Sequence, residues 1–265
     1  MYAVYASLAD CYQEHAAKIG FLELGLSADT DYADRIAELS SLTFLSNSDA
    51  HSPRPSKLAR EFNQMQLQDL TYREIVMALS RQGGRRVTLN AGFFPEEGKY
   101  NRTACTRCYQ QYSAPRMAEL MGRCPSCGGR IKLGVADRIS ALADHELPVH
   151  PDHRPPYKHI IPLAEIIALA IGKKSVMTAG VQRCYRELTE TKTEIDVLLE
   201  ADLDDLRAEE RIKQAIADFR SGRVAVQPGG GGRYGTIGLP GSADRHEELH
   251  GKCPANGVQR SLCDF

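Results

Sequence analysis

The stretch "FLELGLSADTDYADRIAELSSLTFLSNSDAHS", residues 21–52, decides the fold class. Its apolar segments 21–26 and 42–49 are typical of short buried strands. The segment between them, "DYADRIAELSS", begins with acidic residues that suit a helix dipole. Further on, "LTYREIVMALSRQGG" (70–84) is expected to be a helix closed by two glycines. Strand and helix alternate, so we predict an α/β fold with parallel pairing.

The composition is that of an ordinary globular protein, since hydrophobic residues make up 42% of the 265 and charged residues 25%. No apolar run reaches the roughly 20 residues that span a bilayer. No basic and then apolar leader opens the sequence, so we expect a cytoplasmic protein without a membrane partner. The net charge of −1 hides an uneven distribution. Residues 99–138 hold eight Lys and Arg against two acids, and residues 194–210 hold eight acids against one Arg.

Four of the eight cysteines form two C-x-x-C pairs, Cys105/Cys108 and Cys124/Cys127, separated by 15 residues. This spacing is that of a four-cysteine zinc site, because two tight knuckles together complete a tetrahedron of thiolates. The alternative is four free thiols. The other four cysteines are isolated along the sequence, which suits a reducing compartment. A closed four-thiolate site has no open position, so the zinc is expected to be structural.

The segment around these cysteines is basic. Its cationic residues can contact phosphates, or they can form a solvated surface. They are Arg102, Arg107, Arg116, Arg123, Arg130, Lys132 and Arg138.

Asp49 and His51 follow a predicted strand, at the edge where α/β folds place their sites. A carboxylate and an imidazole two residues apart on an extended segment point to the same side, so both can reach one metal cluster. The alternative is a turn aspartate with a surface histidine. Glu23 lies within the first predicted strand between apolar neighbours, where it is either a site residue or a buried carboxylate paired with an arginine.

The later part of the chain has a different pattern of predicted elements. Residues 85–135 contain short strand-like pieces, and residues 145–157 form a proline-rich linker. Three helices are expected within 160–172, 180–190 and 208–222, followed by a hairpin at 223–239 around four glycines.

Six motifs in this order resemble the endonuclease Q family over residues 7–238. They are "CYQEHAAKIGFLELGLSADTDYADRIAELSSLTFLSNSDAHS", "KLAREFN", "FFPEEGKYNRTACTRC", "CPSCGGRIKLGVADRISALAD", "HRPPYKHIIPLAEIIA" and "PGGGGRYGTI". That family comprises DNA-repair nucleases built on a PHP (polymerase and histidinol phosphatase) domain, a distorted β/α barrel. The resemblance implies the carboxyl-terminal part of a PHP domain at 1–95 and a zinc ribbon at 96–145. It further implies a helical DNA-binding domain with the glycine-rich hairpin at 157–238, and a disordered tail is expected at 239–265.

The resemblance also implies an activity and its residues. PHP domains are multi-metal phosphoesterases whose closing motif is Asp-x-His, which Asp49 and His51 match. Asp49 is then the catalytic carboxylate, Glu23 a possible neighbour of the active site, and the metals Mg, Mn or Zn. The implied reaction is cleavage of DNA on the 5′ side of deaminated bases (uracil, hypoxanthine, xanthine) or abasic sites. Arg107, Arg130 and Lys132 are the residues predicted to contact DNA.

One departure from the family pattern matters for activity. A PHP domain opens with a His-x-His pair, and this sequence contains none. We therefore expect that the chain lacks the first half of its catalytic domain, is inactive alone, and is either truncated or completed by another chain. The alternatives are a non-catalytic DNA-binding remnant and a PHP-type phosphoesterase that acts on a small molecule.

Overall fold

The computed structural model describes residues 5–52 and 60–240. The chain divides into two compact units. The first comprises Met1–Asp49, Glu61–Ile160 and Pro228–Gly235, and the second comprises Ala50–Arg60, Ile161–Gln227 and Thr236–Phe265. The tail predicted at 239–265 lies outside the described residues beyond Pro240.

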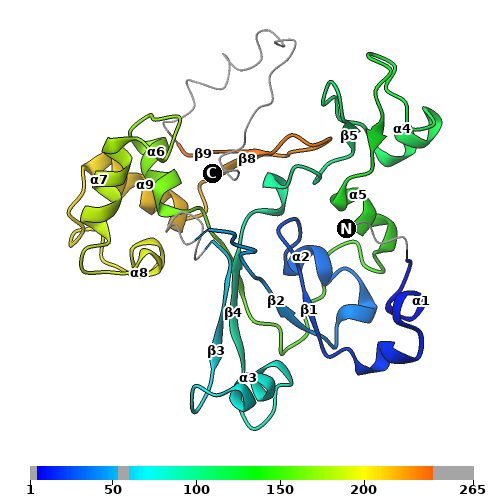
Figure 1. The fold of residues 1–265 in the computed structure, drawn as a ribbon, viewed down its shortest axis with the longest axis horizontal. Coiled ribbons are helices and arrows are strands. Elements are labelled where there is room, and N and C mark those ends of the chain that lie inside the picture. The colour runs from blue at the N-terminus through cyan, green and yellow to red at the C-terminus, as the bar shows by residue number, and fades with distance from the viewer. Residues whose placement is uncertain (1–4, 53–59, 241–265) are drawn as a thin grey trace. The chain divides into compact units, whose positions relative to one another are not determined.

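The first unit mixes short helices and strands, as an α/β fold requires (Figure 1). Its elements are α1 (Leu8–Tyr12), η1 (Gln13–Lys18), β1 (Phe21–Glu23), α2 (Thr30–Ala33), η2 (Ala37–Leu39), β2 (Thr43–Leu45), β3 (Phe62–Gln66), α3 (Tyr72–Leu79), β4 (Arg86–Gly92), η4 (Pro95–Glu97), β5 (Ala104–Cys105), α4 (Ala114–Glu119), β6 (Ile131–Lys132), α5 (Val135–Leu142) and β7 (Tyr157–His159).

The predicted parallel pairing is confirmed between β1 and β2, where Leu22 lies opposite Phe44. Phe44 is fully buried, and it packs with Ala33, Leu39 and Leu42 in the core of this part. The helix expected between the two strands is present as α2 and the 3-10 turn η2. Asp29 begins α2, because its side chain accepts a hydrogen bond from the Tyr32 amide at 2.8 Å.

A second, three-stranded sheet has the order β3-β4-β7. β3 runs antiparallel to β4, whereas β4 runs parallel to β7. Strands β3 and β7 were not predicted from the sequence. The sequence of β3, "FNQMQ", leaves two glutamines exposed, and β7 follows the prolines of the predicted linker. The pairing of the first unit is therefore mixed rather than wholly parallel.

The proline-rich segment 145–157 is held tightly, although it was expected to be a linker. Arg154 lies on the fully buried Asp34, with Nη2 2.7 Å from Oδ1 and Nε 2.9 Å from Oδ2. The guanidinium carbon is 3.3 Å from the centre of the Phe44 ring. His150 Nδ1 also lies 2.7 Å from Asp34 Oδ2. This buried cluster ties the segment to α2 and β2, because a carboxylate out of water needs such partners.

The second unit is helical and ends in a two-stranded hairpin (Figure 1). Its elements are α6 (Leu163–Ala170), α7 (Ala179–Leu188), α8 (Glu194–Leu199), α9 (Glu210–Arg220), β8 (Ala225–Gln227) and β9 (Thr236–Gly238). The three predicted helices correspond to α6, α7 and α9, and the predicted antiparallel hairpin is present. No helix in the described ranges is both long and apolar enough to cross a bilayer.

The apolar helix α6 is the centre of this unit, and it packs against α7, α8 and α9. Pro162 lies at its N-cap and provides no side-chain hydrogen bond. Glu194 caps the helix instead, because its carboxylate accepts a hydrogen bond from the Leu163 amide at 2.8 Å. The Tyr185 hydroxyl donates to the same carboxylate at 2.8 Å. Burial raises the pKa of Glu194, and these two hydrogen bonds oppose the rise.

Candidate metal centre and nucleic-acid interface

The four cysteines of the two knuckles come together in the first unit. Their Sγ atoms all lie within 4.8 Å of one another. Cys105 belongs to β5, which pairs with β6, and the second knuckle ends in two glycines that allow a sharp turn. Gly128 has a φ of +68°, and a Cβ at Gly129 would lie 2.8 Å from the Cys105 Sγ. Both glycines are therefore needed for the second knuckle to close.

The arrangement fits zinc. The Sγ–Sγ separations are 3.5 Å for Cys105 and Cys127 and 3.6 Å for Cys108 and Cys124. Thiolates at about 2.3 Å from a tetrahedral zinc lie about 3.8 Å apart, which is close to these values. The ribbon has a small core of its own, made by two of the cysteines with Ile131. Such a core is too small to hold the fold without a staple, so the metal is expected to stabilise it.

Two hydrogen bonds favour the thiolate form that a metal binds. The Arg107 amide donates to the Cys105 Sγ at 3.3 Å. The Tyr112 hydroxyl lies 3.0 Å from the Cys124 Sγ, and this hydrogen bond lowers the pKa of Cys124 to about 6. The same bond raises the pKa of Tyr112 to about 12, as expected for a hydroxyl that donates to a thiolate.

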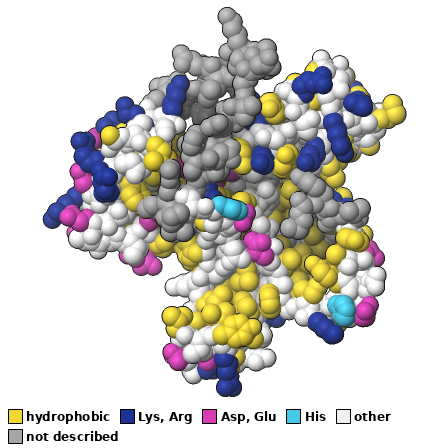
Figure 2. Space-filling model, viewed as in Figure 1, with side chains coloured by type: hydrophobic (Ala, Val, Ile, Leu, Met, Phe, Trp, Pro, Cys, Tyr) yellow, Lys and Arg dark blue, Asp and Glu magenta, His cyan; other side chains and the backbone are white. Residues whose placement is uncertain are grey.

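The cationic side chains of the ribbon are mostly on its surface. Lys and Arg gather over the part that carries β5 and α4 (Figure 2). Arg107 and Arg130 are exposed, and the Arg107 guanidinium donates to the Cys127 carbonyl at 2.9 Å. Lys132 is half-buried, with Nζ 4.0 Å from the centre of the Tyr100 ring. Phosphate contact by these three residues stays a prediction.

Asp49 lies beyond the carboxyl end of β2, as the sequence predicts. Two hydrogen bonds connect the segment before Asp49 to β3. The Asn63 side chain accepts a hydrogen bond from the Ser46 amide at 2.9 Å and donates one to the Ser46 carbonyl at 2.8 Å. The backbone at Asp49 is not extended, since its φ is +47°. Asp49 and His51 are both exposed. Within the described ranges, the cysteines alone form a group of three or more potential metal ligands, so these two residues do not make a metal site without others.

Glu23 is exposed at the end of β1, so its alternative as a buried, arginine-paired carboxylate is wrong. Its carboxylate accepts the Gly25 amide at 3.3 Å. A place beside the active site stays a prediction for this residue.

A histidine that was not predicted as a site residue lies at the carboxyl end of β7. The Nε2 atom of His159 is 3.0 Å from Asp29 Oδ2, and its ring stacks on Phe94 at 4.4 Å. Asp29 is buried and follows β1, so three segments distant in sequence meet here. The signal in the sequence was weak, because a single histidine among apolar residues is usual in a protein core.

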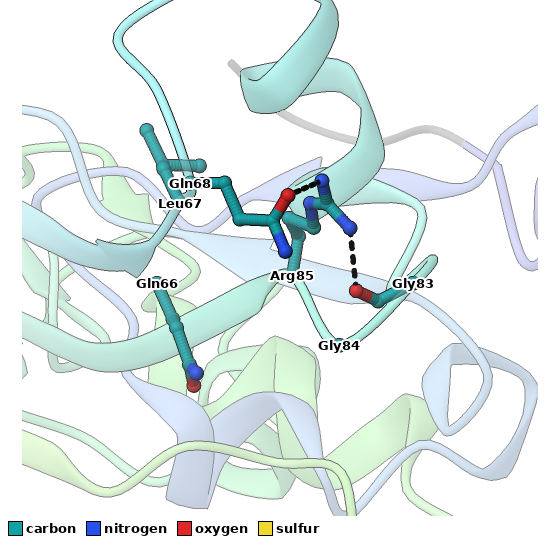
Figure 3. Close-up of a pocket in the computed structure, with 6 residues that line it drawn as sticks. All are labelled: Gln66, Leu67, Gln68, Gly83, Gly84 and Arg85. Atoms are coloured by element: carbon teal, nitrogen blue, oxygen red, sulfur yellow. Dashed lines mark hydrogen bonds between the residues drawn. The ribbon is translucent and has the colours of Figure 1, made fainter.

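A shallow cavity of about 270 Å³ lies elsewhere in the first unit, between β3 and the turn before β4 (Figure 3). Its lining comprises Gln66, Leu67, Gln68, Gly83, Gly84 and Arg85. Arg85 is held there by Gln68 at 2.5 Å and by Glu74 at 2.8 Å. The cavity shares no residue with the predicted sites.

This architecture defines a class of α/β proteins that have a four-cysteine ribbon and a helical unit. Solved structures of endonuclease Q are similar to this chain. The lesion-specific endonuclease PfuEndoQ from Pyrococcus furiosus is 45% identical, with a TM-score of 0.82 over 94% of this chain and 60% of that one. An endonuclease Q in complex with a 27-mer duplex that has an abasic lesion at the active site is 46% identical, with a TM-score of 0.82. It is matched over 90% of this chain and 60% of its own. The resemblance to endonuclease Q and the fold class are thus confirmed.

Two curated relatives and one family model extend the comparison. The uncharacterized protein MJ0043 of Methanocaldococcus jannaschii is 42% identical over 89% of this chain and 30% of its own length. The uncharacterized protein YqxK of Bacillus subtilis is 36% identical over 88% of this chain and 56% of its own. The family model called MJ0043 C-terminal domain matches residues 162–223. The chain therefore spans 30% to 56% of the length of these two curated relatives.

Proposed function

We propose that this chain is part of a metal-dependent DNA endonuclease of the endonuclease Q type. The observation that carries the proposal is the similarity, at 45% identity, to an endonuclease described as lesion-specific. The second neighbour, whose abasic lesion lies at its active site, supports duplex DNA as the substrate class. We place the cut on the 5′ side of deaminated bases or abasic sites.

The ribbon has a structural and binding role in this proposal. Zinc on the four cysteines holds β5 against β6, and the exposed Arg107 and Arg130 contact phosphates. Such contacts release counterions from DNA, so binding is expected to weaken steeply as salt rises. We assign Lys132 to the same surface.

We assign Asp49 and His51 to a catalytic metal site of the PHP type. Two ligands do not hold a multi-metal cluster, so we expect the chain alone to have little or no nuclease activity. Metals in such sites activate a water and neutralise phosphate charge. We propose that the remaining ligands, including a His-x-His pair, come from a segment not contained in this sequence.

A DNA cleavage assay that compares two proteins tests this function. The chain and a fusion that adds the amino-terminal segment of an endonuclease Q with His-x-His are each incubated with a labelled duplex that carries one uracil or hypoxanthine, in Mg or Mn. Nicking 5′ to the lesion by the fusion, with little or none by the chain alone, is expected. A fusion that binds this DNA and never cuts it would contradict the proposal.

The second candidate function is a DNA-binding module without catalysis. The observation that favours it is the lack of a third ligand near Asp49 among the residues that the structure describes. In that case the fusion and the chain bind DNA equally and neither cuts. A small-molecule phosphoesterase is a weaker candidate, because it leaves the basic ribbon without a role.

A further inference from the structure

A tyrosine of the zinc ribbon has a backbone conformation that is unfavourable for a bulky side chain. Tyr109 directly follows Cys108 of the first knuckle, and its φ is +60°, in the left-handed region. The Cβ of an L-residue is crowded in that region, so glycine usually takes such positions. Among the described non-glycine residues with positive φ, Tyr109 is the only aromatic one.

The two knuckles share one backbone arrangement, which shows what the first knuckle requires. In the first, the Tyr109 amide donates to the Cys105 carbonyl at 3.1 Å. In the second, the Gly128 amide donates to the Cys124 carbonyl at 2.9 Å. The amide of each of these two cysteines donates in turn to the carbonyl five residues further on, at 2.9 and 2.8 Å. Tyr109 therefore corresponds to Gly128, whose φ is +68°, and the knuckle needs a left-handed residue there but no ring.

The ring of Tyr109 is directed away from the ribbon core. Tyr112 packs against that core, whereas Tyr109 is 41% exposed. Among the described residues, the Tyr109 side chain makes no hydrogen bond and no ring contact. A Cβ at the corresponding Gly128 would meet no atom within 4 Å, so this position of a knuckle faces open space. The fold of the ribbon therefore gives no reason for an aromatic ring at this position.

The first knuckle is also bordered by two arginines. Arg107 belongs to it and is exposed, and its guanidinium donates to the Cys127 carbonyl at 2.9 Å. Arg130 is exposed as well, and its carbonyl accepts the Thr106 amide at 2.9 Å, which places it beside the knuckle. Lys and Arg dominate the visible face of this part of the ribbon (Figure 2). The surface thus offers an apolar ring together with positive charge.

Double-stranded DNA has the matching chemistry along its backbone. Its phosphates pair with arginine side chains, and the deoxyribose rings between the phosphates present C–H groups. The faces of paired bases lie within the stack, so an aromatic ring on a protein surface meets the sugars first. A ring on a knuckle that zinc and hydrogen bonds hold is already placed, so its contact with DNA requires little further ordering.

We propose that Tyr109 packs its ring against a deoxyribose of duplex DNA, between the phosphates that Arg107 and Arg130 contact. The proposal rests on the DNA endonuclease function above and adds an uncharged contact to its binding surface. The knuckle imposes the unfavourable conformation of Tyr109, and such conformations cluster at functional sites. Glycine would relieve it but would provide no contact with DNA.

The test measures the affinity of the zinc-loaded chain for a labelled duplex, by fluorescence anisotropy at several salt concentrations. Tyr109→Gly is expected to lower the affinity about fivefold at every salt concentration, because the contact of the ring releases no counterions. Tyr109→Phe should stay within about twofold of the wild type, because it keeps the ring. Arg107→Gln should instead lower the salt dependence of binding by about one ion.

Glycine at this position suits the fold, so Tyr109→Gly separates binding from folding. The variant should bind zinc and protect its ribbon amides from hydrogen exchange as the wild type does, since glycine adopts this backbone without crowding. The matched control is Tyr72→Ala, which removes a tyrosine that is 82% exposed at the start of α3. It should leave the affinity for duplex unchanged.

Two results with folded variants would overturn the inference. A Tyr109→Phe variant as weak as Tyr109→Gly would assign the contact to the hydroxyl rather than to the ring. A lower salt dependence in Tyr109→Gly would show that the residue acts only through a neighbouring arginine. If Tyr109→Gly loses its zinc, Tyr109→Asn takes its place, because asparagine also adopts this backbone. Loss of zinc from both would make the role of the ring structural and contradict the proposal.

The same titrations separate this inference from the proposed function. If Tyr109→Gly binds duplex as the wild type does, the contact proposed for Tyr109 is wrong. Weaker binding by Arg107→Gln in that experiment would leave the endonuclease proposal intact. A wild type that binds no duplex at low salt would contradict the proposed function, and this inference with it.

Discussion

The zinc ribbon and the loop that carries Asp49 and His51 are two candidate metal sites of different construction. The ribbon takes all four ligands from residues 105–127, and the structure brings them within 4.8 Å of one another. The Asp49 loop carries two exposed residues that we propose as ligands, and the described residues place no third potential ligand with them. A closed site made by one short segment can be complete within a chain, whereas an open catalytic site is assembled from several strands. A site of the first kind stabilises the fold, whereas a site of the second kind needs ligands from other segments.

The largest expected effect is on the ribbon. Cys124→Ser should abolish binding of about one zinc per chain and unfold residues 100–135, because structural zinc contributes folding free energy directly. Elemental analysis and hydrogen exchange measure the two effects. Cys11→Ser, at an exposed cysteine outside the cluster, is the control and should change neither. A folded ribbon in purified protein without zinc would contradict this account.

Contacts assembled from distant segments should also matter greatly for stability. Arg154→Ala leaves the carboxylate of Asp34 without its arginine, where the two side chains are 2% and 0% exposed. The free energy of unfolding should fall by about 3–5 kcal/mol, measured in urea. The control is Arg183→Ala, whose pair with Glu187 is exposed and 3.8 Å long, and which should cost less than about 1 kcal/mol. Equal losses would show that Asp34 has other adequate partners.

A moderate effect is expected on DNA binding. Charge reversal of Arg107 and Arg130 together should weaken duplex binding roughly tenfold at low salt, whatever the DNA sequence, because phosphate contacts carry no sequence information. Anisotropy titrations over a range of salt measure this. Arg73→Glu, at an exposed residue of α3, is the control. Salt-insensitive binding would favour a small-molecule phosphoesterase instead.

The smallest effect concerns acid stability at the tip of the β3-β4 sheet. The hydrogen bond from Arg85 lowers the pKa of Glu74 from 4.5 to about 2. A carboxylate with a lowered pKa contributes stability above its unfolded value, and that contribution is lost as pH falls through the folded value. Stability of the wild type should therefore decline from about pH 4.5 to about pH 2, and that of Glu74→Gln should decline less. Urea unfolding across this range checks it, and parallel curves would contradict it.

The features that the sequence predicted well are local. The cysteine spacing, the β1-β2 pair and the helices α6, α7 and α9 each follow from a short pattern of residues. The helix α8 was missed because it has six residues, although Thr193 and Asp196 form a capping box at its start. Strand β7 pairs with β4, which lies well over fifty residues earlier, and Arg154 pairs with Asp34 across 120 residues. No local pattern of residues reports such contacts. The pairing of His159 with Asp29 escaped prediction for the same reason.

The most direct test of the account is the role of Asp49 in cleavage. The fusion described above and its Asp49→Ala variant are compared for nicking of a duplex with one deaminated base and for binding of the same duplex, with Asp69→Ala as an exposed control. We expect Asp49→Ala to abolish nicking while DNA binding stays close to that of the wild type, because the ribbon provides the binding contacts. A variant without Asp49 that still nicks the DNA at the wild-type rate would contradict the assignment of the active site.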